Sequence, residues 1–146
     1  MMRGFLVLLF SFLISGFSHA QTDPVISDTI NTKTGLRYIY LLHGSGIKVN
    51  YGAKVTVHYT GRLADGRIFD TSASKPIKFR AGKGEVIKGW DEMLLLMRVG
   101  DVVTAIIPAK LGYGKFGVPD PENDNAYRIP PDAELTFTIR LMDATP

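Results

Sequence analysis

The sequence predicts an α+β domain in which an antiparallel sheet of five to six strands packs on one short helix. Residues 54–60 and 134–141 alternate between apolar and polar side chains, as half-buried strands of an antiparallel sheet do. Residues 90–97 instead carry four large apolar side chains at helical spacing: Trp90, Met93, Leu94 and Met97. Because the surrounding segments have strand character, this helix is expected to pack on the sheet.

The first twenty residues have the pattern of a secretory signal peptide. Arg3 supplies a positive charge, residues 4–17 are uncharged and mostly apolar, and Ala20 precedes the expected cleavage site. An uncleaved membrane anchor is the weaker alternative, because this apolar run is shorter than the roughly 20 residues that a membrane-spanning helix needs. We therefore expect an exported protein, periplasmic or secreted, with no membrane span after cleavage near Ala20.

The remaining chain divides into a polar, flexible lead-in over residues 21–33 and one folded domain over residues 34–146. Strands are expected from β-branched and aromatic content at 36–42, 54–60, 68–70, 77–80, 102–107 and 134–141. Asp65-Gly66 predicts a hairpin turn. Residues 110–125 are rich in glycine, proline and aspartate, which predicts a loop.

Composition excludes several kinds of chemistry. The chain has no cysteine, so disulfides, thiol catalysis and cysteine-bound metals are excluded. His43 and His58 are too few for a zinc site, and His58 is expected to be a packed structural histidine. The net charge is +3 with scattered basic residues, so no nucleic-acid partner is expected. No metal or cofactor is therefore predicted.

Aromatic residues from six different elements are the more informative set: Tyr59, Phe69, Phe79, Trp90, Tyr113 and Phe137. Any one of them alone is typical of a core. Tyr59 and Tyr113 lie beside glycines, where a buried tyrosine can turn its hydroxyl towards a cavity. Asp70 follows Phe69 directly, and its carboxylate is either a turn cap or part of a site.

In these residues the chain resembles the FKBP-type peptidyl-prolyl cis–trans isomerases. Five motifs occur in family order: Val57-His58-Tyr59-Thr60-Gly61, Asp65-Gly66-x-x-Phe69-Asp70-x-Ser72, Gly82-Lys83-x-Glu85-Val86-Ile87-x-Gly89-Trp90-x-Glu92, Tyr113-Gly114 and Ile129-Pro130-Pro131-x-Ala133-x-Leu135-x-Phe137. The resemblance covers roughly residues 34–142. It implies a strongly twisted sheet half-wrapped around the helix, and an enzyme without a cofactor that accelerates rotation of X-Pro bonds in exported polypeptides and assists their folding.

The resemblance also implies a proline pocket with Trp90 as its floor. Its implied substrate-binding residues are Tyr59, Phe69, Phe79, Val86, Trp90, Ile129 and Phe137, with Ile129 closing the rim. The catalytic residues that it implies are Ile87, whose N–H would donate to a substrate carbonyl, Tyr113, whose hydroxyl would do the same, and Asp70, which would supply a polar edge. Proline-containing polypeptides are the expected partners, and macrolide inhibitors of the family are expected ligands.

Three departures from the family pattern lie at or beside the pocket. Ile77 replaces a wall aromatic, the loop over residues 72–75 is shorter than in compact members, and the segment 118–128 is longer. An alternative function follows from this long segment and from Leu95 and Leu96, which lie off the Trp90 face of the helix. If these leucines are exposed, the domain is a client-binding or chaperone module with weak or no isomerase activity.

Overall fold

The computed structural model describes residues 28–146, and the statements below concern that part of the chain. The predicted signal peptide and residues 21–27 lie outside it. Seven strands form one antiparallel sheet, in the order β1-β2-β6-β9-β3-β4 with β5 also paired to β3. They are β1 (Ile30–Asn31), β2 (Arg37–Leu42), β3 (Lys54–Arg62), β4 (Ile68–Thr71), β5 (Ile77–Arg80), β6 (Val102–Ile107) and β9 (Leu135–Thr145). The α+β class with an antiparallel sheet is confirmed.

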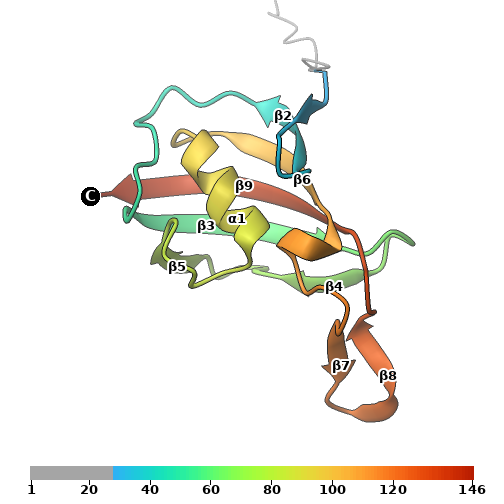
Figure 1. The fold of residues 1–146 in the computed structure, drawn as a ribbon. Helices are drawn as coiled ribbons and strands as arrows, with labels where there is room; N and C mark the ends of the chain where they lie inside the picture. Colours follow the sequence, from blue (N-terminus) through green and yellow to red (C-terminus); the bar gives the residue numbers. More distant parts are fainter. Residues whose placement is uncertain (1–27) are drawn as a thin grey trace, which may run out of the picture.

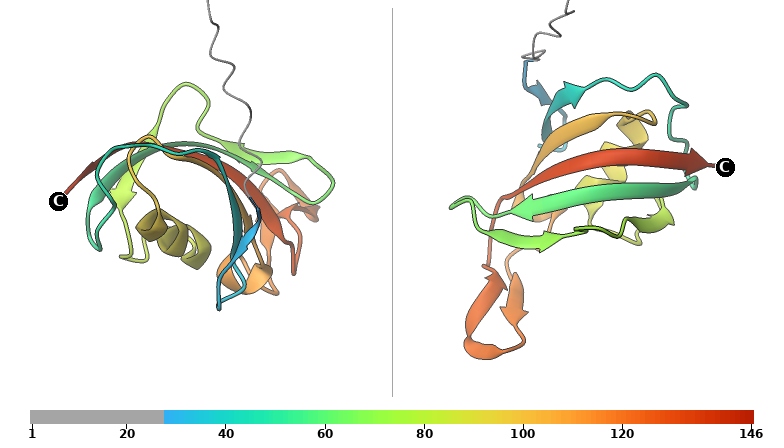
Figure 2. Two further views of the ribbon diagram at one scale, coloured as in Figure 1. Left: turned by 90° about the horizontal axis from the view of Figure 1, so that it is seen from above. Right: turned by 180° about the vertical axis from the view of Figure 1, so that it is seen from behind.

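The sheet is strongly curved, and α1 (Lys88–Leu96), the one α-helix among residues 28–146, lies in its concave face (Figures 1 and 2). Trp90, Met93 and Leu94 are buried against the sheet, as the helical spacing predicted. The helix comes very close to β6 at Gly89, where a Cβ atom would lie 2.6 Å from Ile107 Cγ2. Only glycine therefore allows this approach of the helix to the sheet.

The two alternating segments become the central strands β3 and β9. In β9 the inward side chains are almost completely buried: Leu135, Phe137, Ile139 and Leu141. In β3, Val55 and Val57 are fully buried, while His58 on the other face bonds through Nδ1 to Ser72 Oγ at 3.0 Å. The alternation and the structural histidine are confirmed.

Two features of the chain differ from the prediction. The main sheet has seven strands instead of five to six, partly because Ile30–Asn31, within the expected lead-in, pair with β2. The predicted loop over 110–125 is wrong. It contains the end of a short 3-10 helix, η1 (Ala109–Leu111), and most of a hairpin formed by β7 (Val118–Asp120) and β8 (Asn123–Ile129).

This hairpin extends away from the body of the domain (Figures 1 and 2). Val118 pairs with Ile129 at its base, and Asp120 Oδ1 accepts a hydrogen bond from Glu122 N–H at the tip, 2.9 Å away. Proline, aspartate and asparagine are depleted in most strands but are tolerated here, because the paired segments are exposed for most of their length.

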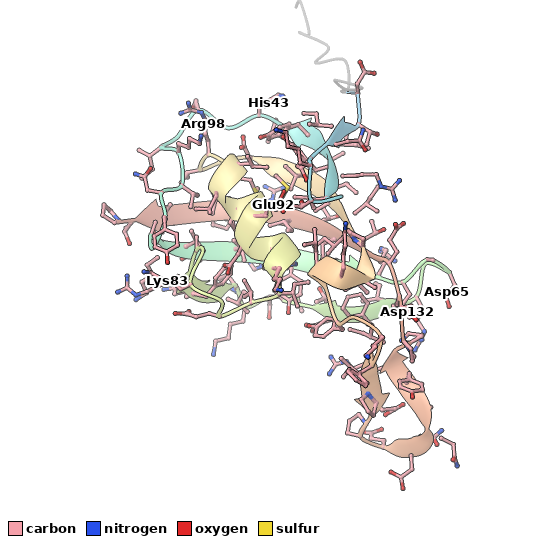
Figure 3. All side chains as sticks on the ribbon, in the orientation of Figure 1. His43, Asp65, Lys83, Glu92, Arg98 and Asp132 are labelled. Atoms are coloured by element: carbon pink, nitrogen blue, oxygen red, sulfur yellow. The ribbon has the colours of Figure 1, made fainter. Side chains whose placement is uncertain are left out.

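Charged side chains are scattered around the outside of the domain, as the labelled residues of Figure 3 show. Within residues 28–146, no group of three or more His, Cys, Asp or Glu side chains is arranged to hold a metal ion. The one α-helix of this part of the chain is too short to cross a membrane.

Candidate active site

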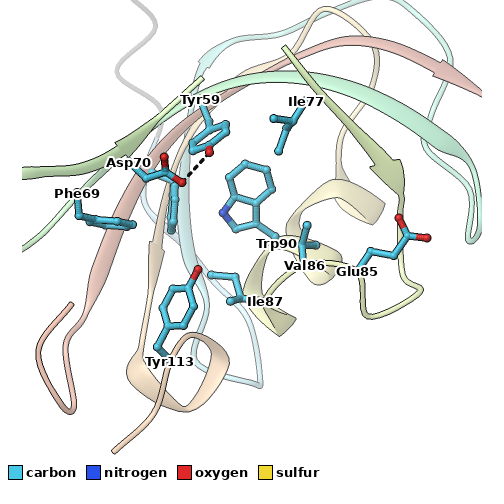
Figure 4. A pocket seen from close by; sticks show the side chains of 10 residues that line it. Tyr59, Phe69, Asp70, Ile77, Glu85, Val86, Ile87, Trp90 and Tyr113 are labelled. Carbon is cyan, nitrogen blue, oxygen red and sulfur yellow. Dashed lines mark hydrogen bonds between the residues drawn. The ribbon is translucent and has the colours of Figure 1, made fainter. Parts of the chain in front are cut away.

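A pocket opens between the concave face of the sheet and the start of α1 (Figure 4). Its volume is about 180 Å³. The lining comes from the sheet, the segment before the helix, the first turn of α1 and the segment after η1: Tyr59, Phe69, Asp70, Ile77, Glu85, Val86, Ile87, Trp90, Tyr113 and Phe137. The lining is therefore mainly aromatic and aliphatic, with its charged groups on Asp70 and Glu85.

Trp90 lies at the centre of a cluster of aromatic rings. Tyr59 and Phe137 meet it edge to face, with ring centroids 4.9 and 5.2 Å away, and Phe79 packs against it at 5.9 Å. Such perpendicular contacts add to the stabilisation that burial gives. The indole Nε1 is buried and has no hydrogen-bond partner among the described residues. In Figure 4 it lies on the side of the ring nearer to Asp70 and Tyr113.

The close approach of two wall residues depends on Gly61 in β3. A Cβ atom at this position would lie 2.7 Å from both the Phe69 and the Phe137 rings. Those two rings contact each other edge to face with centroids 5.4 Å apart. The glycine thus lets two aromatic side chains close one side of the pocket.

Asp70 lies in β4 and Tyr59 in the adjacent strand β3, so sheet pairing brings them together. The Tyr59 hydroxyl donates to Asp70 Oδ2 at 2.7 Å, and Asp70 Oδ1 accepts from Thr71 N–H at 2.9 Å. Burial first, and then the hydrogen bond and charge of Asp70, raise the pKa of Tyr59 above its ordinary value. Tyr59 therefore stays protonated, and its proton is directed to Asp70 and not to the open pocket.

Two donors at the pocket have no partner in the described part of the chain. The Tyr113 hydroxyl makes no hydrogen bond, and the N–H of Ile87, the residue that precedes α1, makes none either. Partial burial and then the charge of Asp70 raise the pKa of Tyr113, although 41% of the residue is exposed. Both groups can therefore donate to a bound carbonyl at neutral pH.

Most of the predicted site residues line this pocket, but Phe79 and Ile129 do not. Phe79 is 7% exposed and packs against Trp90, so it supports the floor. Ile129 is 3% exposed and lines an adjoining cavity with Phe69, Asp70, Tyr113, Val118 and Arg128. The structure thus corrects their placement, while the catalytic and substrate-binding roles remain predictions.

Two residues near the site were not assigned a role from the sequence. Glu85 lines the pocket, and its Oε2 accepts a hydrogen bond from Arg80 N–H at 3.0 Å. Its place beside Val86 in the third motif was the available signal. Arg128 reaches the site from the hairpin, and no sequence pattern pointed to it.

The family model of the FKBP-type peptidyl-prolyl cis-trans isomerases matches residues 46–142. The chain belongs to this family. It is 38% identical over 146 residues to FK506-binding protein 2 of Kluyveromyces lactis, an alignment that covers 96% of this chain and 89% of the relative. The crystal structure of AtFKBP13 superposes with a TM-score of 0.76 at 33% identity, over 81% of this chain and 99% of that one.

Some FKBP relatives are much longer than this chain. FK506-binding protein 4 of Dictyostelium discoideum is 40% identical over 116 residues, which are 80% of this chain but only 30% of the relative. The similarity to such proteins therefore concerns their FKBP domain.

Proposed function

We propose that this FKBP-family chain accelerates cis–trans rotation of X-Pro bonds in exported polypeptides and thereby assists their folding. The observation that best supports this is an apolar pocket, closed below by Trp90, with two unpaired donors, Ile87 N–H and Tyr113 O–H. Polypeptides containing proline are the proposed substrates, and macrolides are proposed as competing ligands.

The pocket can lower the barrier without covalent chemistry. Amide resonance sets a barrier of roughly 18–20 kcal/mol, and the twisted transition state loses the charge separation of the planar amide. Water stabilises the polar planar form, whereas the rings around Trp90 do not, so the barrier to rotation of an X-Pro bond placed there is lowered. Each tenfold increase in rate requires the activation free energy to fall by about 1.4 kcal/mol.

The two free donors supply orientation. Carbonyls on either side of the X-Pro bond can accept from Ile87 N–H and Tyr113 O–H, which holds the peptide in a turned conformation. The Asp70 carboxylate lies at the edge between Tyr59 and Tyr113 and keeps Tyr59 in place. No bond is made or broken, so these residues need no nucleophile or metal.

The experiment that tests this function is isomerisation of a short X-Pro-Phe peptide by the mature chain, residues 21–146, with and without a macrolide inhibitor. We expect acceleration that the macrolide blocks. Acceleration that the macrolide does not inhibit would indicate that the pocket departs from the family pattern at its rim, where Ile77 and the hairpin lie. A folded protein without any acceleration would refute the proposed activity.

Replacing Tyr113 by phenylalanine is expected to lower kcat/KM about threefold to tenfold, because one carbonyl loses its donor at a cost of about 0.5–1.5 kcal/mol. Stability should stay unchanged, since the hydroxyl has no hydrogen-bond partner among the described residues. Isomerase assays and thermal unfolding of both proteins measure these two effects. Equal kcat/KM would show that the hydroxyl does not contact substrate.

The proposed export rests on the signal-peptide pattern of residues 1–20. Expression of the full chain in a bacterium is expected to give a periplasmic or secreted product that begins at Gln21. Fractionation followed by intact-mass measurement checks this. A cytoplasmic product that retains Met1–Ala20 would contradict it.

The alternative client-binding function has specific but weaker support. Leu95 packs against the core, whereas Leu96 is 37% exposed, so these leucines offer little joint surface. Phe116, just before the hairpin, is 76% exposed, and Tyr127, within β8, is 45% exposed. Suppressed aggregation of a proline-free client, without isomerase activity, would favour this alternative over the enzyme.

A further inference from the structure

Arg128 lies near the end of β8, and its side chain returns from the hairpin to β4. Its Nε donates to the Phe69 carbonyl oxygen at 3.0 Å, and its Nη2 lies 3.7 Å from Asp70 Oδ1. The guanidinium therefore contacts two consecutive residues of β4. The other side-chain hydrogen bonds of residues 118–129 stay within the hairpin.

We propose that Arg128 is a positioning residue that holds the β7–β8 hairpin against the Asp70 edge of the pocket, so that the hairpin helps to bind client residues next to the proline. This inference rests on the proposed isomerase function. Arg128 does not line the main pocket; it acts through Asp70 and through the placement of the hairpin.

A cavity beside this contact would allow the hairpin to contact a bound peptide. A second cavity of about 130 Å³ is lined by β4, Tyr113 and the hairpin: Phe69, Asp70, Tyr113, Val118, Arg128 and Ile129. It shares Phe69, Asp70 and Tyr113 with the main pocket. A peptide whose proline occupies the main pocket can therefore extend across Tyr113 onto the hairpin.

The geometry of the contact between Arg128 and β4 indicates that Arg128 acts by positioning the hairpin more than by its charge. The Arg128 and Asp70 side chains are 51% and 43% exposed, and an ion pair this exposed contributes little by itself. A planar guanidinium, however, can donate to a carbonyl and face a carboxylate at once, which fixes its orientation. Lysine carries the same charge on a flexible chain and cannot reproduce this geometry.

The test compares Arg128→Ala, Arg128→Lys and a matched control, Arg67→Ala, in the mature chain. Arg67 lies in the exposed turn before β4, and its side chain makes no hydrogen bond or ion pair with residues 28–146. ¹⁵N relaxation of residues 118–127 reports the order of the hairpin. KM and kcat are measured on a short X-Pro-Phe peptide and on a longer peptide that extends on both sides of the proline.

We expect Arg128→Ala to lower the order of the hairpin and to raise KM for the longer peptide about threefold to tenfold, with kcat nearly unchanged. The short peptide should be affected less, Arg128→Lys should recover only part of the loss, and Arg67→Ala should match the unmodified protein. An unchanged hairpin would overturn the proposal, as would an unchanged KM or full recovery by lysine. If the unmodified protein has no activity, the proposed function fails, whereas the relaxation measurement still tests whether Arg128 holds the hairpin.

Discussion

Replacing Phe137 by alanine is expected to lower the free energy of unfolding by about 3–5 kcal/mol, the usual range for removal of a buried aromatic ring. Phe137 is 3% exposed and contacts the rings of Tyr59, Phe69 and Trp90. Since small domains are stable by only about 5–15 kcal/mol, this loss is a large fraction of the total. Urea denaturation measures it directly.

The same substitution removes one wall of the pocket, so isomerase activity should fall even at temperatures where the variant is folded. Phe137→Leu is the matched control, because it keeps most of the volume and should cost less than about 1.5 kcal/mol. A leucine variant that is folded but slow would show that the aromatic ring of Phe137 contributes to activity separately from its contribution to core packing. An alanine variant with unchanged stability would show that Phe137 is not packed as described.

Replacing Asp70 by leucine is expected to reduce kcat/KM about tenfold to a hundredfold, equivalent to about 1.4–2.8 kcal/mol of transition-state stabilisation. The substitution leaves the Tyr59 hydroxyl without its acceptor 2.7 Å away and removes the carboxylate from the pocket edge. The Asp70 side chain is 43% exposed, so the fold should remain intact. Steady-state kinetics and circular dichroism measure the two effects.

A double-mutant cycle with Tyr59→Phe distinguishes two roles of Asp70. If the carboxylate acts by orienting Tyr59, adding Asp70→Leu to Tyr59→Phe should change kcat/KM little. If it acts on substrate directly, the two losses should add. Full activity of the single Asp70→Leu variant would show that Asp70 serves only as a turn cap. Its hydrogen bond from Thr71 N–H is consistent with that role.

The elements that the sequence predicted well are those whose burial follows a simple period. β3 and β9 alternate because one face packs on the core and the other does not, and α1 carries its apolar residues every three to four positions. The β7–β8 hairpin has no such pattern. Most of its side chains are exposed, so pairing of the backbone, and not burial, determines its structure.

For the pocket, too, some features could be predicted from the sequence and others could not. Family motifs predicted residues such as Tyr59, Asp70 and Trp90 that the structure brings to one cavity. They could not show that Phe79 lies behind Trp90, since only three-dimensional packing separates a wall residue from its support. The approach of Arg128 to Phe69 joins positions 59 apart in sequence, and no local pattern encodes it.

The position of β9 has a consequence for the order of events during synthesis. β9 is the last strand of the described residues, yet it lies between β6 and β3: residues 135–140 pair with β6, and residues 136–145 pair with β3. Lys54 pairs with Thr145, so the middle of the sheet cannot close until all of β9 has been synthesised and has left the ribosome.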